Sequence, residues 1–289
     1  MSAAVALARP CPACGRNRGR AGLRAGGYEL AACRCGLRML AGALDDGLTL
    51  TANTEKYGDE DYNRWYRSVK PLLVERYRND LAEIEALLPS KGRILDVGCA
   101  YGWFLEVARE RGWHTAGVEV EEATAHLARE GGIDVTLGTL HDASFDDASF
   151  DCVGLWDVLE HVPDVDAFLA ECRRVLKPGG VLAVQSPNVR SVMAKLMGSD
   201  WSWLLLPQHV YHFTPKSMNR TLERRGFTVA RSYTWEPTEA FVQDAARKIG
   251  LLNKVRVRKA ATPLVATMEK AWCAAGWGGL LRVYARRTA

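Results

Sequence analysis

Residues 95–104, LDVGCAYGWF, read as a buried strand that ends in a glycine-containing turn and continues into a helix. Gly98 and Gly102 can adopt positive φ angles, and a glycine lets a ligand approach the backbone closely. The free N–H groups at the start of the following helix favour a negatively charged or polar partner. The stretch alone fits a binding turn or a plain structural turn, and the rest of the chain decides between them.

Strand and helix patterns alternate from this stretch as far as residue 187. Apolar runs predict strands at 93–98, 114–120, 133–138, 150–157 and 181–187. Helical patterns lie at 103–112, 121–132 and 165–180. Such alternation is typical of an α/β protein, in which a parallel sheet carries helices on both faces and binds ligands at the carboxyl ends of its strands. Further patterns predict helices at 64–88 and 191–207, a helix and a strand within 208–235, and helices followed by a strand at 280–286.

An acidic residue occupies the end of the second predicted strand. Glu119 stands in the run GVEV, 23 positions after Asp96. A carboxylate at the tip of a neighbouring parallel strand can accept hydrogen bonds from both hydroxyls of a ribose. Glu119 and the glycine-containing turn together favour a pocket for a nucleoside-containing ligand.

Four motifs in this order and spacing resemble the class I S-adenosylmethionine-dependent methyltransferases: ILDVGCAYG, GVEV, FDCVGLWDVLEHVPD and VLKPGGVLAVQSPN. The closer likeness is to a small-molecule group in which WDVLEHV is followed later by QHVYHFTPKSMNRTLERRGF. The resemblance covers residues 54–289. It implies a Rossmann-like, doubly wound sheet of seven strands and an enzyme that uses S-adenosylmethionine. The cofactor half is expected at about 90–190, with acceptor or cap elements at about 54–88 and 190–275.

The resemblance assigns the residues at the amino-acid end of the cofactor. Asp96 would face the cofactor's ammonium group, or it would only fix the turn. Gly98, Ala100 and Gly102 occupy the three glycine positions of the family's turn, D-x-G-x-G-x-G. Ala100 adds one methyl group at the middle position, at small cost if its φ angle is negative. Glu119 would bind the ribose.

The remaining cofactor contacts follow from the same resemblance. The family often places an acid after the third strand to receive the adenine amine, but this chain has Thr139 there. The backbone of Leu140 or the side chain of Asp142 would then recognise adenine. Trp156 and Asp157 would line the pocket at the reactive end of the cofactor.

Two histidines are candidates for the general base that removes a proton from the methyl acceptor. The first is His209 in the segment QHVYHF, which could instead anchor a lid over the substrate. The second is His161 in LEHV, which could instead be a structural hydrogen-bonding group.

Four cysteines in the first 36 residues predict a small N-terminal module over residues 1–45. CPAC and CRC bring Cys11, Cys14, Cys33 and Cys35 into a spacing that suits a tetrahedral zinc site. The second pair is C-x-C, whereas a zinc ribbon usually repeats C-x-x-C. Related methyltransferases carry a similar ribbon at the N-terminus, so we expect Zn²⁺ here, with the methyltransferase domain at 54–289.

Composition narrows the class of protein. The chain has 289 residues, 48% hydrophobic and 25% charged, with a net charge of +4. These values are typical of a soluble globular protein. No run approaches the roughly 20 apolar residues of a membrane span, and no secretory signal is apparent, so we expect a cytoplasmic protein whose cysteines are thiols or metal ligands.

The acceptor is less well defined by the sequence than the cofactor. Residues 1–44 carry seven arginines and the single acid Glu29, a net charge of +6 that could attract RNA. We expect methyl transfer to oxygen or nitrogen of a small-molecule, sugar or lipid-like acceptor. The alternatives are a ribosomal RNA methyltransferase and a non-catalytic zinc-ribbon protein on the same scaffold. No feature of the sequence indicates an oligomeric state.

Overall fold

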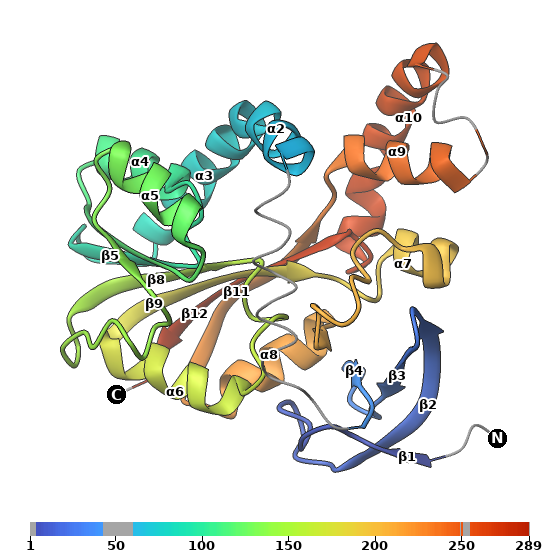
Figure 1. The fold of residues 1–289 in the computed structure, drawn as a ribbon, viewed down its shortest axis with the longest axis horizontal. Coiled ribbons are helices and arrows are strands. Elements are labelled where there is room, and N and C mark those ends of the chain that lie inside the picture. The colour runs from blue at the N-terminus through green and yellow to red at the C-terminus, as the bar shows by residue number, and fades with distance from the viewer. Residues whose placement is uncertain (1–3, 43–59, 249, 251–254, 289) are drawn as a thin grey trace. The chain divides into compact units, whose positions relative to one another are not determined.

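A computed structural model describes residues 4–42, 60–248, 250 and 255–288 of the chain (Figure 1). Its larger sheet has seven strands in the order β11-β12-β9-β8-β5-β6-β7. These strands are β5 (Arg93–Val97), β6 (His114–Glu119), β7 (Val135–Leu137), β8 (Phe150–Trp156), β9 (Leu176–Pro187), β11 (Phe227–Trp235) and β12 (Leu280–Arg287). The predicted seven-stranded, doubly wound α/β fold is confirmed.

Parallel pairing sets the position of the binding edge. Strand β5 pairs in parallel with both β6 and β8, and β6 pairs in parallel with β7. The chain therefore leaves β5 to one side for β6 and β7, and then returns to the other side for β8. The crevice at such a reversal of strand order, at the carboxyl ends of the strands, is where ligands bind in these sheets.

Helices cover both faces of the sheet. Helix α4 (Trp103–Glu110) buries Phe104, Leu105 and Val107, and it lies with α3 (Lys70–Glu85) and α5 (Glu122–Glu130) on one face (Figure 1). On the other face, α6 (Val165–Val175) begins where the Asp164 carboxylate accepts hydrogen bonds from two backbone N–H groups of its first turn. The remaining helices are α2 (Glu60–Ser68), α7 (Val192–Met197), the 3-10 helix η1 (Gly198–Asp200), α8 (Pro215–Glu223), α9 (Thr238–Lys248) and α10 (Val255–Ala274).

Two of the predicted helices are interrupted. The pattern at 64–88 forms α2 and α3, because Pro71 at the start of α3 has no N–H to donate to the preceding turn. The segment 191–207 is helical only as far as η1, and Gly198 ends α7 with a φ angle of +59°.

A third helix is shorter than the pattern predicts. Helix α6 ends at Val175 instead of residue 180. Pro178 follows closely, and the residue before a proline is forced toward extended backbone. Residues 176–180 accordingly belong to β9.

The N-terminal segment forms a second, smaller sheet. Its strands are β1 (Ala4–Ala6), β2 (Arg18–Ala25), β3 (Tyr28–Ala32), β4 (Arg38–Leu40) and β10 (Tyr211–His212), in the order β1-β2-β3-β4-β10. All four pairings are antiparallel.

The chain divides into two compact units. Unit 1 comprises Met1–Asp45, Gln185–Thr221 and Arg231–Val283, and unit 2 comprises Asp46–Val184, Leu222–Ala230 and Tyr284–Ala289. Unit 1 thus joins the N-terminal segment to later parts of the chain, whereas the predicted domains were 1–45 and 54–289. The predicted boundary itself falls within residues 43–59, which lie outside the described residues.

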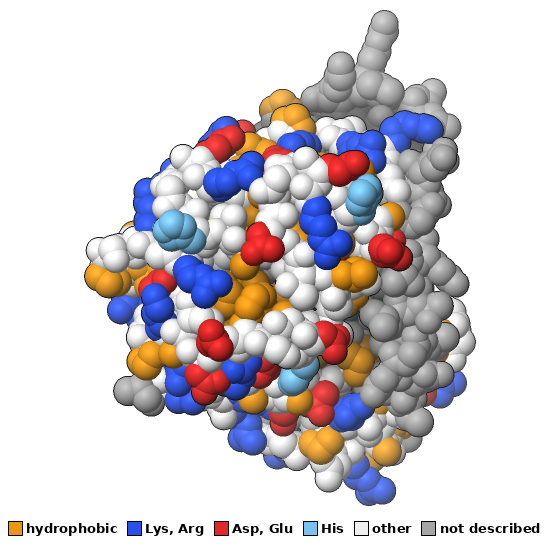
Figure 2. Space-filling model, turned by 60° about the vertical axis from the view of Figure 1, so that its left-hand side comes forward, with side chains coloured by type: hydrophobic (Ala, Val, Ile, Leu, Met, Phe, Trp, Pro, Cys, Tyr) orange, Lys and Arg blue, Asp and Glu red, His pale blue; other side chains and the backbone are white. Residues whose placement is uncertain are grey.

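The described surface carries charges of both signs. Figure 2 shows acidic and basic side chains interspersed over the face that it views, with hydrophobic side chains between them. Interspersed charges do not build the single-sign field that draws a polyanion to a surface. Among the described helices, none combines the length and the apolar character that crossing a membrane requires.

Candidate functional site

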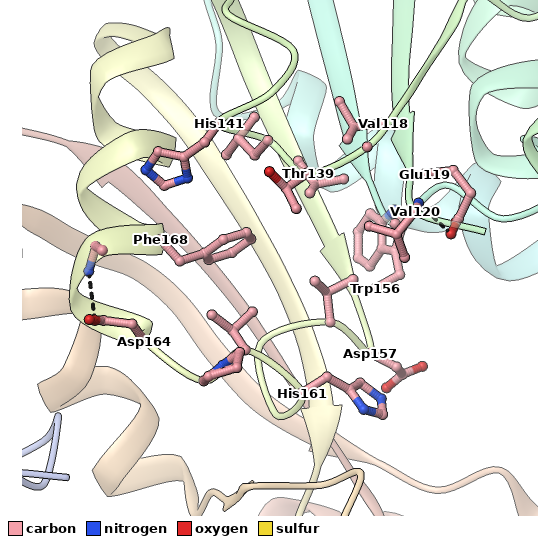
Figure 3. A pocket seen from close by; sticks show the side chains of 18 residues that line it. Val118, Glu119, Val120, Thr139, His141, Trp156, Asp157, His161, Asp164 and Phe168 are labelled. Carbon is pink, nitrogen blue, oxygen red and sulfur yellow. Dashed lines mark hydrogen bonds between the residues drawn. The ribbon is translucent and has the colours of Figure 1, made fainter. Parts of the chain in front are cut away.

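A cavity of about 490 Å³ lies in unit 2, at the carboxyl ends of β5, β6 and β8 (Figure 3). This volume is typical of a small-molecule or cofactor pocket. Six of the residues predicted from the sequence line it: Gly98, Glu119, Leu140, Trp156, Asp157 and His161. Asp96, Ala100 and Gly102 lie within four residues of Gly98 in the chain but are not among the residues that line the cavity.

The turn after β5 requires glycine at its first position. Gly98 has a φ angle of +71°, and its N–H donates to the carbonyl oxygen of Val118, 2.8 Å away. A Cβ atom at this position would lie 2.9 Å from a methyl carbon of Val158, which is closer than real contacts allow. The bare backbone of Gly98 therefore forms part of the cavity wall.

Ala100 adopts a conformation that the sequence did not predict. Its φ angle is +45°, in the left-handed region, and its side chain is buried. A left-handed residue with a Cβ atom costs roughly 1–2 kcal/mol. The small cost expected for Ala100 depended on a negative φ angle, so alanine at this position carries the conformational cost of a left-handed residue.

Asp96 is a buried acid without a full set of partners. Its side chain is 2% exposed, and its Oδ1 atom has no hydrogen-bond partner in the described part of the chain. Burial, and then the charge of Glu119, raise the pKa of Asp96 well above its ordinary value of 3.8. An unpartnered buried carboxylate is costly, so a cation bound here would be strongly favoured.

Glu119 already holds part of the backbone around the cavity. Its Oε2 atom accepts a hydrogen bond from the N–H of Ala100 at 2.8 Å, and its Oε1 atom accepts from Val120 and Glu121 at 2.8 and 3.0 Å. Burial raises the pKa of Glu119, and these three N–H groups oppose that rise. Two carboxylate oxygens offer about four acceptor positions, so the side chain retains capacity for a ligand.

Residues 138–141 line the cavity, whereas Asp142, the alternative candidate for adenine recognition, does not. Oδ2 of Asp142 accepts hydrogen bonds from the backbone N–H and the hydroxyl of Thr139, at 2.8 and 2.7 Å. The hydroxyl of Thr139 holds the pKa of Asp142 below its usual range. Asp142 thus caps its own turn, whereas Leu140 lines the cavity and is buried.

Phe168 on α6 lines the cavity and was not predicted (Figure 3). His141 and Pro163 also line the cavity and were not predicted. An amphipathic helix pattern shows that Phe168 faces inward, but it does not distinguish a core position from a ligand-facing one. In the sequence, the aromatic side chain of Phe168 is the one feature that could have suggested contact with a ligand.

The segment after β8 supplies the last wall. Trp156 packs edge-on against Phe104, with ring centroids 4.9 Å apart. Asp157 has a φ angle of +58°, an uncommon conformation that tends to occur at functional sites. The side chains of Asp157 and His161 project from the same loop, and both residues line the cavity (Figure 3).

His209 and His212 lie in unit 1 and are oriented by backbone carbonyl groups. Nδ1 of His209 is 2.8 Å from the oxygen of Trp203, and Nε2 of His212 is 2.9 Å from the oxygen of Leu204. A carbonyl oxygen only accepts, so the proton is on Nδ1 in His209 and on Nε2 in His212. Burial lowers the pKa of His212 to about 4, which leaves it neutral near pH 7.

The four N-terminal cysteines converge in unit 1. Their Sγ atoms all lie within 4.8 Å of one another, with Cys11–Cys35 at 3.5 Å and Cys14–Cys33 at 3.4 Å. A tetrahedron with Zn–S bonds of about 2.3 Å has sulfur–sulfur edges of roughly 3.8 Å. The donor set and its dimensions therefore fit a zinc ion.

The shortened C-x-C pair still reaches the cluster. The N–H of Gly36 donates to the oxygen of Cys33 at 3.0 Å, and the N–H of Cys33 donates to Leu37 at 2.8 Å. Gly36 has a φ angle of +99°, which turns the chain sharply after Cys35. In the C-x-x-C pair, Cys11 and Cys14, the corresponding hydrogen bond runs from the N–H of Gly15 to the oxygen of Cys11. A tighter turn thus compensates for the missing residue.

Comparison with known proteins gives a family match. A family model described as "Methyltransferase domain" matches residues 63–232. A ubiquinone biosynthesis O-methyltransferase of Hahella chejuensis is 34% identical over 166 residues, which are 52% of this chain and 68% of that protein. A probable S-adenosylmethionine-dependent methyltransferase of Mycolicibacterium smegmatis is 32% identical over 190 residues, or 65% of this chain and 68% of that protein.

Solved structures agree on the fold. A methyltransferase of Thermotoga maritima, described as a possible histamine N-methyltransferase, superposes with a TM-score of 0.55 at 19% identity and covers 83% of this chain and 100% of its own. A SAM-dependent methyltransferase of Archaeoglobus fulgidus gives 0.55 at 20% identity, covering 75% of this chain and 94% of its own. At these identities the likeness concerns the fold alone.

Proposed function

The chain belongs to the family of methyltransferase domains, and we propose that it methylates an oxygen or nitrogen atom of a small-molecule, sugar or lipid-like acceptor, with S-adenosylmethionine as donor. The pair of buried acids, Asp96 and Glu119, carries this proposal. Glu119 is the last residue of β6 and lines the cavity, while Asp96 lies near the end of the neighbouring parallel strand β5, two residues before Gly98. When bound, the cofactor supplies an electrophilic methyl group.

The residues present fit this cofactor. The unpartnered oxygen of Asp96 suits an ammonium group, and the one acceptor position that remains on Oε2 of Glu119 suits a ribose hydroxyl. The bare backbone at Gly98 permits close approach of the ligand. Leu140 would contact adenine through its backbone, and Trp156 and Asp157 would line the pocket. Ala100 and Gly102 would shape the turn without touching the cavity.

The acceptor is proposed as an alcohol, phenol or amine. The name of the Hahella relative, an O-methyltransferase, supports oxygen. Transfer requires the acceptor atom to be held in line with the methyl group, and it is assisted by removal of one proton.

His209 is our candidate for the general base. Its Nδ1–H donates to the oxygen of Trp203, which orients the ring and puts the basic lone pair of the neutral tautomer on Nε2. His161 is the second candidate, because it lines the cavity. His212 is a poor base at neutral pH, since burial lowers its pKa to about 4.

We also propose that Cys11, Cys14, Cys33 and Cys35 hold one structural zinc ion. Four protein ligands complete its coordination and leave no open position, so the metal would stabilise the fold and take no part in methyl transfer. Elemental analysis should find one equivalent of zinc in the purified protein, and none in a Cys14→Ser, Cys33→Ser double variant.

Calorimetric titration with S-adenosylhomocysteine tests the proposed function first, because this product binds without any acceptor. Micromolar affinity supports the pocket, and methyl transfer to oxygen or nitrogen compounds then supports the acceptor class. Transfer to RNA, with binding that weakens steeply with salt, would instead support a ribosomal RNA methyltransferase. Tight cofactor binding without transfer to any acceptor would support the scaffold alternative, and no binding by folded, zinc-loaded protein would contradict the proposal.

A further inference from the structure

The four-cysteine cluster is joined to the segment of the candidate base by one sheet. Strand β4 pairs with β10, with Met39 opposite Tyr211 and Arg38 opposite His212. The N–H of Leu40 also donates to the oxygen of Val210 at 3.1 Å. The last strand of the N-terminal sheet thus comes from the QHVYHF segment, more than 170 residues later in the chain.

The second cysteine pair leads directly into this pairing. Cys33 and Leu37 close the hairpin that precedes β4, through the N–H of Cys33 and the oxygen of Leu37. Leu37 and Met39 are fully buried. Gly36 packs so closely against Thr214, which follows β10, that a Cβ atom would lie 3.1 Å from its hydroxyl oxygen. The position of β4 therefore depends on the fold of this hairpin.

Strand β10 in turn fixes the loop that carries His209. The loop begins at Trp203 and Leu204, whose carbonyl groups orient His209 and His212. It ends at β10, which consists of only two residues. On the other side, the N–H of Val189 donates to the oxygen of Phe213 at 3.0 Å. A strand of two residues is not stable unless its neighbours hold it in place.

A module of about 40 residues buries too little apolar surface to fold on its own, and metal binding then supplies much of its folding free energy. The geometry points to the following inference: the zinc-loaded four-cysteine module is a positioning device for the methyl-acceptor side of this enzyme. It holds the loop 203–213, and with it His209, by extending its sheet through β10. This inference rests on the proposed function, because it assumes that His209 acts on the acceptor.

Hydrogen–deuterium exchange on the full-length protein tests the coupling without any assay of activity. Removal of zinc with a chelator, or the Cys14→Ser, Cys33→Ser variant, should raise the exchange rate of peptides from 38–40 and 203–213 roughly tenfold or more, because their sheet loses its support. Peptides from β5 should exchange as before, since they belong to unit 2. Cys273→Ser is the matched control, because Cys273 lies in unit 1 outside the cluster.

Nitrogen NMR of the histidine rings provides a second measurement. The loaded protein should show His209 protonated at Nδ1 and His212 at Nε2, which give distinct spectra. Both signals should shift toward the averaged pattern of a mobile ring when zinc is removed. Unchanged exchange in 203–213 and unchanged ring signals, in protein shown to lack metal, would overturn the inference.

The two proposals fail in different ways. If the zinc-loaded protein does not bind S-adenosylhomocysteine, the proposed function fails, whatever the hydrogen–deuterium exchange of residues 203–213 shows. If metal removal leaves S-adenosylhomocysteine affinity within twofold but lowers kcat/KM for the acceptor at least tenfold, both are supported. An unchanged kcat/KM in metal-free protein would overturn the positioning role.

Discussion

Glu119→Gln is the substitution that best tests the cofactor site. The change keeps the shape of the side chain and removes its charge. One oxygen becomes an NH₂ group, which cannot accept a hydrogen bond. The least costly orientation keeps an oxygen for Val120 and Glu121, and it turns the NH₂ group toward the N–H of Ala100.

These contacts set the size of two effects of the substitution, on the free energy of folding and on the affinity for the cofactor product. Leaving one buried N–H group unsatisfied costs about 1–3 kcal/mol of folding free energy. Part of this loss is offset, because burial raises the pKa of Glu119 and the uncharged amide avoids that penalty. One hydrogen bond from a ribose hydroxyl to the carboxylate contributes about 1.5–3 kcal/mol, so affinity for S-adenosylhomocysteine should fall roughly 10- to 150-fold.

Titration calorimetry measures the affinity, and urea unfolding measures the stability. Glu121→Gln is the matched control, because the carboxylate of Glu121 caps α5 by accepting from Ala123 and Thr124 and does not line the cavity. The control should lose about 0.5–2 kcal/mol of stability and keep its affinity. An affinity of Glu119→Gln within twofold of the wild type, or equal losses of affinity in both variants, would refute the ribose assignment.

Three further predictions concern the same pocket and its candidate bases. Asp96→Asn should weaken S-adenosylhomocysteine binding yet stabilise the ligand-free protein. Because the pKa of Asp96 is raised in the folded state, the wild-type protein should lose stability as the pH rises from about 3.8 toward that folded-state pKa. Thermal melts of the variant over the same pH range should not show this decline. Ala100→Gly should keep wild-type affinity, whereas Ala100→Val should lower the free energy of unfolding by roughly 1–3 kcal/mol in urea, because a branched side chain is strained at a φ of +45°; equal stability of the two variants would contradict this. His209→Gln should lower kcat at least tenfold with cofactor affinity intact, and the same result for His161→Gln instead would move the base to that residue.

The sequence predicted the parts of the fold that depend on local patterns. The apolar run of β5, the turn at Gly98 and the acid at Glu119 all lie where the alternation of strands and helices placed them. The end of α6 was predicted wrongly because the glycines after Pro178 were included in the helix, although a proline already restricts the residue before it.

Contacts between distant segments could not be predicted in this way. The pairing of β10 with β4 involves two residues, and no periodicity marks so short a strand. The bond from Ala100 to Glu119 depends on a left-handed backbone angle that alanine rarely adopts. The role of Phe168 in lining the cavity could not be predicted either, because the spacing of apolar residues along α6 is the same for a core position and for a ligand-facing one.

The bond between Glu119 and Ala100 also bears on the kinetics of cofactor binding. The protein's own carboxylate holds the turn in one conformation in the ligand-free protein, so the entropy of ordering this turn is lost during folding. The encounter then requires no slow closure of the turn. Association should accordingly show a single phase whose rate rises linearly with cofactor concentration, and selection among ligands at this end of the pocket should appear in their dissociation rates.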